Sequence, residues 1–535
     1  MPFLMNIKKG KIFLRLKRIF RRKQMKSKVG KCLMVLCLVI FIVAGCSAKE
    51  NPTENQEYTS LQELNGKRVG IITGASYEGD VQKELPDAKL LQTINYADAI
   101  VAMESDKMDA CITEDPISVY QMEEHEGLAK LPGYLTEYDY AFMLSNGNVE
   151  LLEEVNEAIR EMKEDGTIER LKEEWMNPDQ EKKMDSTEKN SLSKGVLRVA
   201  TSADAQPFSY IENNQVVGFD IELMSKIAEK LGYEIEIETM AFSGVVPSIQ
   251  TGKADIAVGG LSITLDLPEL VTFSEPIFHS GTVALVDQGL SVQKMGFWEE
   301  LKESFVRTFV TEARWKLIGK GLLITLLLSG LSAVLGSLLG FGFSFALCSK
   351  NKKLRNGAAG ISKILEGIPL VVLLMLLYYV IFKRIDISAV GVGVIGFTID
   401  FANTTAGLLK AGIATVDSGQ SEAATAMGYS RWNVFFKIVF PQAVRNVFSQ
   451  YEDAVVGLIK NTSVIGYIAV EDLTMASDMI RGRTYDAFFP LIATAVLYFL
   501  IAQVFVFLLK RVDIRLDPKR RKRAVKGVTI DDPNL

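Results

Sequence analysis

Histidine and cysteine are scarce in this chain of 535 residues, which has two histidines and five cysteines. Neither His125 nor His279 has neighbours of the metal-ligating kind, so no metal centre is expected. Five scattered cysteines do not make the framework of a disulfide-stabilised domain. The loop G-x-x-x-x-G-K-[ST], which cradles nucleotide phosphates, is also absent. The sequence therefore predicts a chain that holds no cofactor and does not hydrolyse ATP through such a loop.

Charge is distributed unevenly along the chain, although the net charge is only −5. Lysine and arginine crowd residues 8–31 and 510–526, whereas residues 50–180 are acidic. Basic residues beside apolar runs are typical of the cytoplasmic flanks of membrane spans. We therefore expect the chain to interact with a membrane and not with nucleic acid.

The first 46 residues have the organisation of a lipoprotein signal peptide: a basic region, the apolar run CLMVLCLVIFIV, and VAGC ending at Cys46. The apolar run has 12 residues, which is short for a membrane helix. We predict that Cys46 is lipidated and that the chain from residue 47 onward is delivered outside the cytoplasm. An uncleaved anchor is the alternative, and translation from Met25 would also give a complete signal.

Two regions of the chain alternate strand-like and helical patterns. Residues 65–176 place short apolar runs such as KRVGII and DACIT between helical stretches, and residues 195–288 show the same alternation. The segment between them, 177–194, is polar and has no apolar periodicity, which predicts a linker. The sequence therefore predicts two α/β lobes of similar make-up.

The second half of the chain contains apolar runs long enough to cross a membrane. Residues 321–348 carry no charge over 28 residues, more than the roughly 20 that a spanning helix needs. Further candidate spans lie at 367–382, 387–409, 446–470 and 488–509. Basic residues after the first span and in the tail, 517–535, place the amino-terminal side outside and the tail inside. We expect five spans, preceded by an amphipathic segment, 295–320, along the outer interface.

The run GVGVIG, 391–396, matches a dinucleotide-binding pattern, with Asp417 at about the expected ~20 residues downstream. No strand, turn and helix unit surrounds it, and it lies inside a predicted span. Small residues in spans let helices approach closely, and Gly336 and Gly340 are interpreted in the same way. We therefore do not predict a nucleotide site.

The stretch EAATAMGYSRWNVFFKIVFPQA, 422–443, lies where the predicted topology places cytoplasm. It resembles the EAA loop of ABC transporter permeases. The neighbouring GLIKNTSVIGYIAVEDL is similar to the permeases for polar amino acids, so 318–516 is identified as a permease domain. In that family the loop docks on a separate ATP-hydrolysing subunit. The resemblance gives this role to Glu422, Ala423, Ala424 and Gly428.

The α/β regions resemble the extracytoplasmic solute-binding proteins of the amino acid type. LRVATSADAQPFSYIENNQVVGFDIEL and VPSIQTGKADIAVGGLSIT are similar to the first lobe, and ELNGKRVGIITGASYEGDV and ADAIVAMESDKMDACITEDP to the second. Their order is reversed, which implies a circularly permuted domain. Lobe II is 57–148, and lobe I is 195–288 together with its C-terminal helices, 149–176. Two truncated domains, each completed by a partner chain, are the alternative.

The resemblance also carries candidate solute-binding residues to this chain. In lobe I, Phe208 would pack on the solute, while Gly260, Ser262 and Thr264 would offer backbone and hydroxyl groups. In lobe II, Ser76 would donate a hydrogen bond, and Glu114 or Asp115 would meet an ammonium group. Leu267 stands where the family typically has an arginine that clamps the solute carboxylate. This departure favours a cationic or amine-bearing solute.

Asp400 is a carboxylate within a predicted span, which is unusual and suggests a role in the solute path. Pairing with a neighbour such as Lys460 is the alternative interpretation.

Taken together, the patterns predict a bilobed α/β module joined to an all-α permease with five spans. The resemblance implies a subunit of an ABC importer in the bacterial plasma membrane, with the lobes outside. It implies a homodimer that captures amino acids or related small polar solutes and is powered by separate subunits that bind ATP. A ligand-gated receptor or channel with a bilobed sensor is the alternative. A bilobed enzyme is a further one, but no acid and base set supports it.

Overall fold

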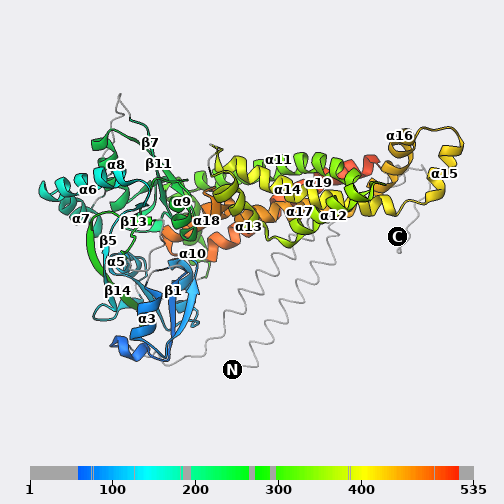
Figure 1. Cartoon of the computed structure of the whole chain (residues 1–535). Coiled ribbons are helices and arrows are strands. Elements are labelled where there is room, and N and C mark those ends of the chain that lie inside the picture. The colour runs from blue at the N-terminus through cyan, green and yellow to red at the C-terminus, as the bar shows by residue number, and fades with distance from the viewer. Residues whose placement is uncertain are drawn as a thin grey trace, which may run out of the picture. The chain divides into compact units, whose positions relative to one another are not determined.

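The computed structural model describes residues 58–516, apart from 74, 76, 126, 181, 183, 185–193, 264–270, 289–296, 384, 386 and 487. The predicted signal peptide with Cys46 and the basic tail, 517–535, lie outside the described residues. So do three positions of the predicted solute site, Ser76, Thr264 and Leu267. The described chain forms an α/β module with three sheets and a set of long helices (Figure 1).

The first sheet has the strand order β2-β1-β3-β14-β4, with β5 paired to β14. Its strands are β1 (Arg68–Ile72), β2 (Lys89–Thr93), β3 (Ala110–Glu114), β4 (Leu128–Lys130), β5 (Thr136–Tyr140) and β14 (Phe278–Asp287). The connecting helices are α3 (Glu78–Glu84), α4 (Tyr96–Glu104) and α5 (Asp115–Glu124), after the short η1 (Leu61–Leu64). Strands β1 and β3 are almost wholly buried because helices cover a parallel sheet on its faces. We refer to this part as lobe II.

The second sheet has the order β11-β7-β12-β6-β13, and a small sheet β10-β9-β8 lies in the same lobe, lobe I. Its strands are β6 (Met143–Ser145), β7 (Val196–Thr201), β11 (Glu234–Thr239), β12 (Ile256–Ala257) and β13 (Val271–Phe273). The small sheet contains β8 (Asp204–Ala205), β9 (Ser209–Glu212) and β10 (Gln215–Val217). The helices are α6 (Val149–Glu164), α7 (Thr167–Met176), α8 (Phe219–Leu231) and α9 (Phe242–Gln250). The alternating sequence EIEIET forms β11, which is the edge strand of its sheet.

The chain passes between the two sheets twice, between β5 and β6 and between β13 and β14. Strand β14 falls in the sequence region 195–288 yet pairs with β3, and β6 falls in 57–148 yet pairs with β12. Each sheet is thus completed by a strand from the other region. At the crossing, the Phe142 N–H donates to Ser274 Oγ at 3.1 Å.

The helical part begins with short, broken elements where one amphipathic segment was expected. Helix α10 (Phe297–Phe305) is followed by a π-turn, η2 (Val306–Val310), and a 3-10 turn, η3 (Thr311–Ala313). Glu312 and Ala313 have positive φ angles of 54° and 51°, so the chain turns sharply there. Glu312 bonds with Arg314 at 2.8 Å, and its C=O accepts from Asn214 of lobe I at 2.9 Å. These contacts account for the turn.

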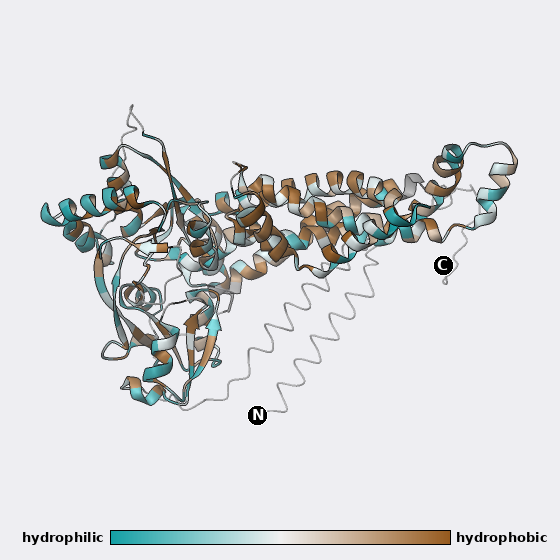
Figure 2. Ribbon diagram, in the orientation of Figure 1, coloured by the Kyte–Doolittle hydropathy of each residue, from teal (hydrophilic) through white to brown (hydrophobic). Residues whose placement is uncertain are grey.

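The remaining elements are helices, and the longest of them are predominantly apolar (Figure 2). They are α11 (Trp315–Leu347), α12 (Lys352–Gly367), α13 (Leu370–Met375), η4 (Leu376–Ile381), α14 (Ala389–Ala414), α15 (Ser418–Ala426), α16 (Arg431–Val434), η5 (Phe435–Val439), α17 (Phe440–Asn461), η6 (Thr462–Ile468), α18 (Leu473–Thr484) and α19 (Phe488–Leu516). Three helices in the described residues are long and apolar enough to cross a membrane, namely Trp315–Leu347, Ala389–Ala414 and Phe489–Val512. Two bent pairs, with bends of 104° and 56°, raise the number to as many as five.

Glycines let α11 and α14 approach closely, as expected for small residues in spans. A Cβ atom on Gly340 would lie 2.5 Å from the Ala402 carbonyl oxygen, and one on Gly336 would lie 3.0 Å from Phe401. Within the GVGVIG run, a Cβ on Gly393 would lie 2.4 Å from Ile465. The run therefore serves helix packing.

Lobe I lies directly against the long helices. Lys253 Nζ donates to the Phe382 carbonyl at 2.9 Å and lies 4.8 Å from the ring centroid of Tyr378. Thr239 Oγ1 donates to Glu471 Oε1 at 2.6 Å. The Ala241 N–H donates to the carbonyl of Gly466 at 3.3 Å, so backbone as well as side chains joins the two parts.

Candidate functional site

Two half-buried carboxylates from different lobes lie close enough for their charges to interact. Glu114 ends β3, and Asp204 begins β8. Tyr96 donates its hydroxyl to Glu114 Oε2 at 2.5 Å. Burial raises the pKa of Glu114, and the negative charge of Asp204 adds to that rise while the Tyr96 hydrogen bond opposes it. Burial raises the pKa of Asp204 to about 6, opposed by a hydrogen bond from Ser202.

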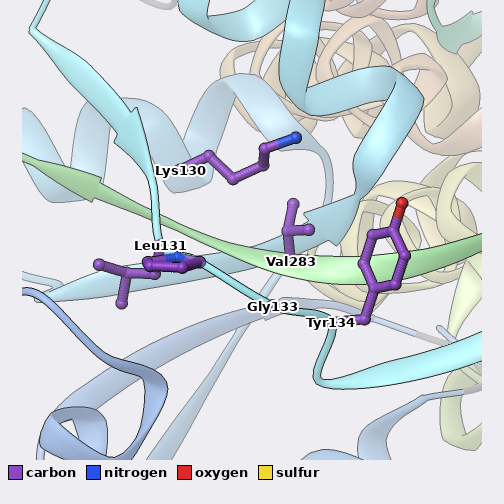
Figure 3. A pocket seen from close by; sticks show the side chains of 6 residues that line it. Lys130, Leu131, Gly133, Tyr134 and Val283 are labelled. Atoms are coloured by element: carbon purple, nitrogen blue, oxygen red, sulfur yellow. The ribbon is translucent and has the colours of Figure 1, made fainter.

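Asp115, the alternative to Glu114 for an ammonium group, is already paired. Its carboxylate accepts from Lys130 Nζ at 2.5 Å and from the Tyr134 hydroxyl at 2.9 Å. Lys130 and Tyr134 line a pocket of about 280 Å³ with Leu131, Pro132, Gly133 and Val283 (Figure 3). Glu114 accepts a hydrogen bond from a neutral hydroxyl, whereas Asp115 is paired with the positive charge of Lys130.

Phe208 contacts a residue of lobe II, and Gly260 is engaged within lobe I. The Phe208 ring is fully buried and stacks on Tyr140, with centroids 5.6 Å apart and an interplanar angle of 16°. The N–H groups of Gly259 and Gly260 both donate to Asp220 Oδ2 at 2.8 Å. Burial raises the pKa of Asp220 to about 6, and these two hydrogen bonds oppose the rise. Phe208 therefore belongs to the core, and the Gly260 N–H already has an acceptor.

Ser262 lies at the junction of the lobes, where it forms an isolated β-bridge with Tyr140. Two backbone hydrogen bonds support the bridge, from Ala141 N to Leu261 O at 3.0 Å and from Ile263 N to Asp139 O at 2.7 Å. The segment that carries Ser262 is thus held beside the crossing strands.

The C-terminal end of α18 and the residue after it contact both lobes, and sequence reasoning did not select them. Arg481 pairs with Asp98 of lobe II, and Arg483 donates to Gln206 Oε1 of lobe I at 3.0 Å. The Tyr485 ring is fully buried and lies edge-on to His125 of lobe II. Sequence reasoning could have selected them because two arginines lie in a predicted outer loop, whereas basic residues are usually enriched in cytoplasmic loops.

Asp204 should make the stability of the chain depend on pH. Its pKa is raised from the usual 3.8 to about 6, so between these values the folded chain binds more protons than the unfolded chain. Its favourable contribution is therefore full below about pH 4 and is lost as pH rises through about 6. Asp204→Asn should melt at a higher temperature than the natural chain at about pH 7.5 and at a similar temperature at about pH 4. Thermal melting of the full-length chain measures this, and a variant that melts lower at both pH values would contradict it.

The loop resembling the EAA motif folds as two short helices, α15 and α16, joined at Gly428. Gly428 has a φ of 85°, a conformation that side chains rarely adopt. Glu422 and Ala423 are exposed, whereas Ala424 is only 4% exposed and packs with Val434 and Val439 of the loop itself. Ala424 therefore holds the two helices together, and the exposed surface is formed by its neighbours.

Large apolar side chains are exposed on the same loop, with Met427 75% and Trp432 66% accessible. Asp400 of α14 is half-buried, and Lys460 of α17 is exposed. No ion pair joins these two residues in the part of the chain that the structure describes.

Two family models match the chain. Residues 197–369 match the bacterial extracellular solute-binding proteins, family 3. Residues 333–518 match the binding-protein-dependent transport system inner membrane component.

Individual proteins are similar to the permease part. The "Probable amino-acid ABC transporter permease protein YckA" of Bacillus subtilis is 33% identical over 186 residues, 35% of this chain and 82% of the relative. GlnP of Rickettsia typhi, provisionally named a glutamine transport system permease protein, is 30% identical over 199 residues, 37% of this chain and 91% of the relative. A crystal structure of an amino acid ABC transporter with histidines is 28% identical with a TM-score of 0.36, over 42% of this chain and 100% of that chain.

The sequence matches to YckA and GlnP cover most of each relative, and apolar helices occupy much of residues 333–518, which the inner membrane component model matches. The chain therefore belongs to the binding-protein-dependent inner membrane transport components, as a membrane subunit that fuses an amino acid-type ABC importer permease to a family 3 solute-binding domain.

Proposed function

We propose that this chain captures an amino acid or a related small polar solute outside the bacterial plasma membrane and passes it through its permease helices. Separate subunits that bind and hydrolyse ATP supply the energy by docking on residues 422–443. The observation that carries this proposal is the presence, in one polypeptide, of a two-lobed α/β module and a permease loop with an exposed apolar surface. The relatives named for amino acid and glutamine transport favour the same solute class.

A homodimer with five spans per chain is part of this proposal, because ABC transport pathways need two transmembrane halves and this chain has one. Three long helices and two bent pairs are compatible with that number. The lipidated Cys46 would tether the module outside the membrane.

We further propose that the solute-binding domain is one circularly permuted domain. Both sheets contain strands from before and after the linker at 177–194, and each sheet is complete within one chain. The match to the solute-binding family begins at residue 197, after the linker. These observations favour one permuted domain over two fragments completed by a partner chain.

Reconstitution in proteoliposomes tests the function. We expect the full-length chain, assembled with its ATPase subunit, to accumulate at least one radiolabelled amino acid against a gradient when ATP is supplied. The matched control is the same preparation with a non-hydrolysable ATP analogue, which should show binding without accumulation. Downhill flux that needs no ATP would instead indicate a ligand-gated channel and would overturn the proposal.

A further inference from the structure

The end of α18, residues Arg481–Tyr485, lies between the two lobes although it belongs to the permease. Arg481 is only 5% exposed. Its guanidinium pairs with Asp98 of α4 in lobe II and with Asp478 of its own helix at 2.8 Å. A buried guanidinium of the permease thus forms an ion pair with a carboxylate of lobe II.

Gly482 packs against Asp204, the half-buried carboxylate of lobe I. A Cβ atom at this position would lie 2.7 Å from the Asp204 Cβ and 3.1 Å from its Cα. The Cα and Cβ atoms of Asp204 cannot move aside by rotation of the side chain. The backbone of the α18 end therefore rests directly on Asp204, whose charge in turn acts on Glu114 of lobe II.

Arg483 extends this contact along lobe I and back to lobe II. Besides its hydrogen bond to Gln206, its guanidinium lies 3.7 Å from Glu212 of lobe I and 3.8 Å from Glu124 of lobe II. The guanidinium carbon is 5.4 Å from the centroid of the Tyr210 ring, within range of a cation–π interaction. Two positive side chains thus lie among carboxylates of both lobes.

We propose that the α18 end occupies the place of the solute, with Arg481 standing in for the solute's positive group, so that a cationic amino acid and this segment compete for the same carboxylates. This inference rests on the proposed function and adds two things to it. It names the solute class, an amino acid with a guanidinium or ammonium side chain. It also names the element of the permease that displaces the solute.

The charge balance between the lobes is the first argument. Asp98, Glu124 and Glu212 are half-buried, and removing a carboxylate even partly from water is costly without a partner of opposite charge. When Arg481 and Arg483 lie between the lobes, they provide the positive charge for Asp98, Glu124 and Glu212. When they leave, a cationic solute can supply that positive charge to the half-buried carboxylates, whereas a neutral solute cannot.

The second argument is the attachment of α18 to the permease helices. The Leu473 N–H donates to Thr325 Oγ1 of α11 at 3.1 Å, and Tyr498 of α19 donates its hydroxyl to Asp472 at 2.8 Å. The N-terminal end of α18 is therefore held by two long helices while its other end lies between the lobes. Movement of those helices would carry the arginines with it, and the solute would be released beside the permease.

Binding of radiolabelled L-arginine to the full-length chain in nanodiscs tests the proposal, with L-glutamine as the neutral comparison. Arg481→Gln removes the competing charge, and Gly482→Ala pushes the segment off Asp204 while keeping both arginines. If the α18 end occupies the site most of the time, each variant should bind L-arginine about tenfold more tightly. The apparent dissociation constant of the natural chain is the intrinsic one divided by the fraction of sites that are free of the α18 end. Arg170→Gln, on the surface of α7, and Gly319→Ala, with no atom within 4 Å of its Cβ position, are the matched controls.

Asp98→Asn separates competition from a purely structural contact. If Asp98 serves both arginine and solute, its loss should weaken L-arginine binding about tenfold, opposite to the effect of Arg481→Gln. If the ion pair is purely structural, Arg481→Gln and Asp98→Asn should both lower the melting temperature and should change the affinity for L-arginine in the same direction. That result would overturn the proposal.

The remaining outcomes are also decisive. Unchanged L-arginine affinity in a folded Gly482→Ala variant would show that the segment does not compete. Tighter L-glutamine binding in place of L-arginine would overturn the cationic class. If neither the natural chain nor any variant binds an amino acid and ATP-driven accumulation also fails, the proposed function itself is wrong; accumulation with unchanged affinities contradicts the inference alone.

Discussion

A valine at position 428 is expected to reduce ATP-driven uptake by more than about tenfold while solute binding outside the membrane stays unchanged. Gly428 has a φ of 85°, and its Cβ position meets no atom within 4 Å, so a side chain would be strained without clashing. A β-branched residue there costs about 1–3 kcal/mol, which the loop can relieve by changing the angle between α15 and α16. Uptake and solute-stimulated ATP hydrolysis in proteoliposomes are the measurements.

Gly428→Asn is the matched control for this result. Asparagine tolerates the left-handed backbone conformation, so this variant should keep most of the uptake. Equal activity of the valine and asparagine variants would show that the turn conformation does not matter for coupling. Loss of solute binding in the valine variant would instead indicate general misfolding.

The second large effect is expected at the contact between α11 and α14. Leucine in place of Gly340 would place its Cβ 2.5 Å from the Ala402 carbonyl oxygen and 2.8 Å from the Thr405 Cβ. Neither neighbour can rotate away as a flexible side chain would, so the two helices must separate. Overpacking of this kind costs roughly 1–3 kcal/mol or more. We expect a markedly lower melting temperature of the detergent-solubilised chain and a smaller yield of monodisperse protein.

Gly342→Leu tests whether the effect belongs to this contact. Gly342 lies two residues along the same helix, and no atom lies within 4 Å of its Cβ position. This variant should therefore melt like the natural chain. A similar loss of stability in both variants would point to helix propensity or lipid exposure, and the close contact with α14 would not be the cause.

The α/β regions and the apolar helices could be predicted because their patterns are local. The short apolar run RVGII, the alternation in EIEIET and the uncharged run from 321 to 348 can each be recognised within a short stretch of sequence. The exchange of β6 and β14 between the sheets could not be predicted in this way. The hydrogen bond from Phe142 to Ser274 joins residues 132 positions apart, and no local pattern encodes which strand accepts such a partner.

Some residues of the candidate site could likewise be predicted from local motifs, and others could not. Glu114 and Gly260 lie in recognisable motifs, and the structure gives the first a neutral partner and the second an acceptor, Asp220. The pairing of Arg481 with Asp98 spans 383 positions, and Gly482 meets Asp204 only through the packing of the permease on the lobes. Sequence could show two unusual arginines, but their partners depend on tertiary structure.

The attachment of lobe I to the permease through Lys253 and Thr239 has a kinetic consequence. A free binding protein must find its transporter by diffusion, so transfer depends on its concentration. Here the receiving helices and the module share one chain and remain in contact, which corresponds to a local concentration on the order of millimolar. Under the proposed function, transfer from the module to these helices would be a first-order step, with a rate that does not depend on the concentration of a free binding protein.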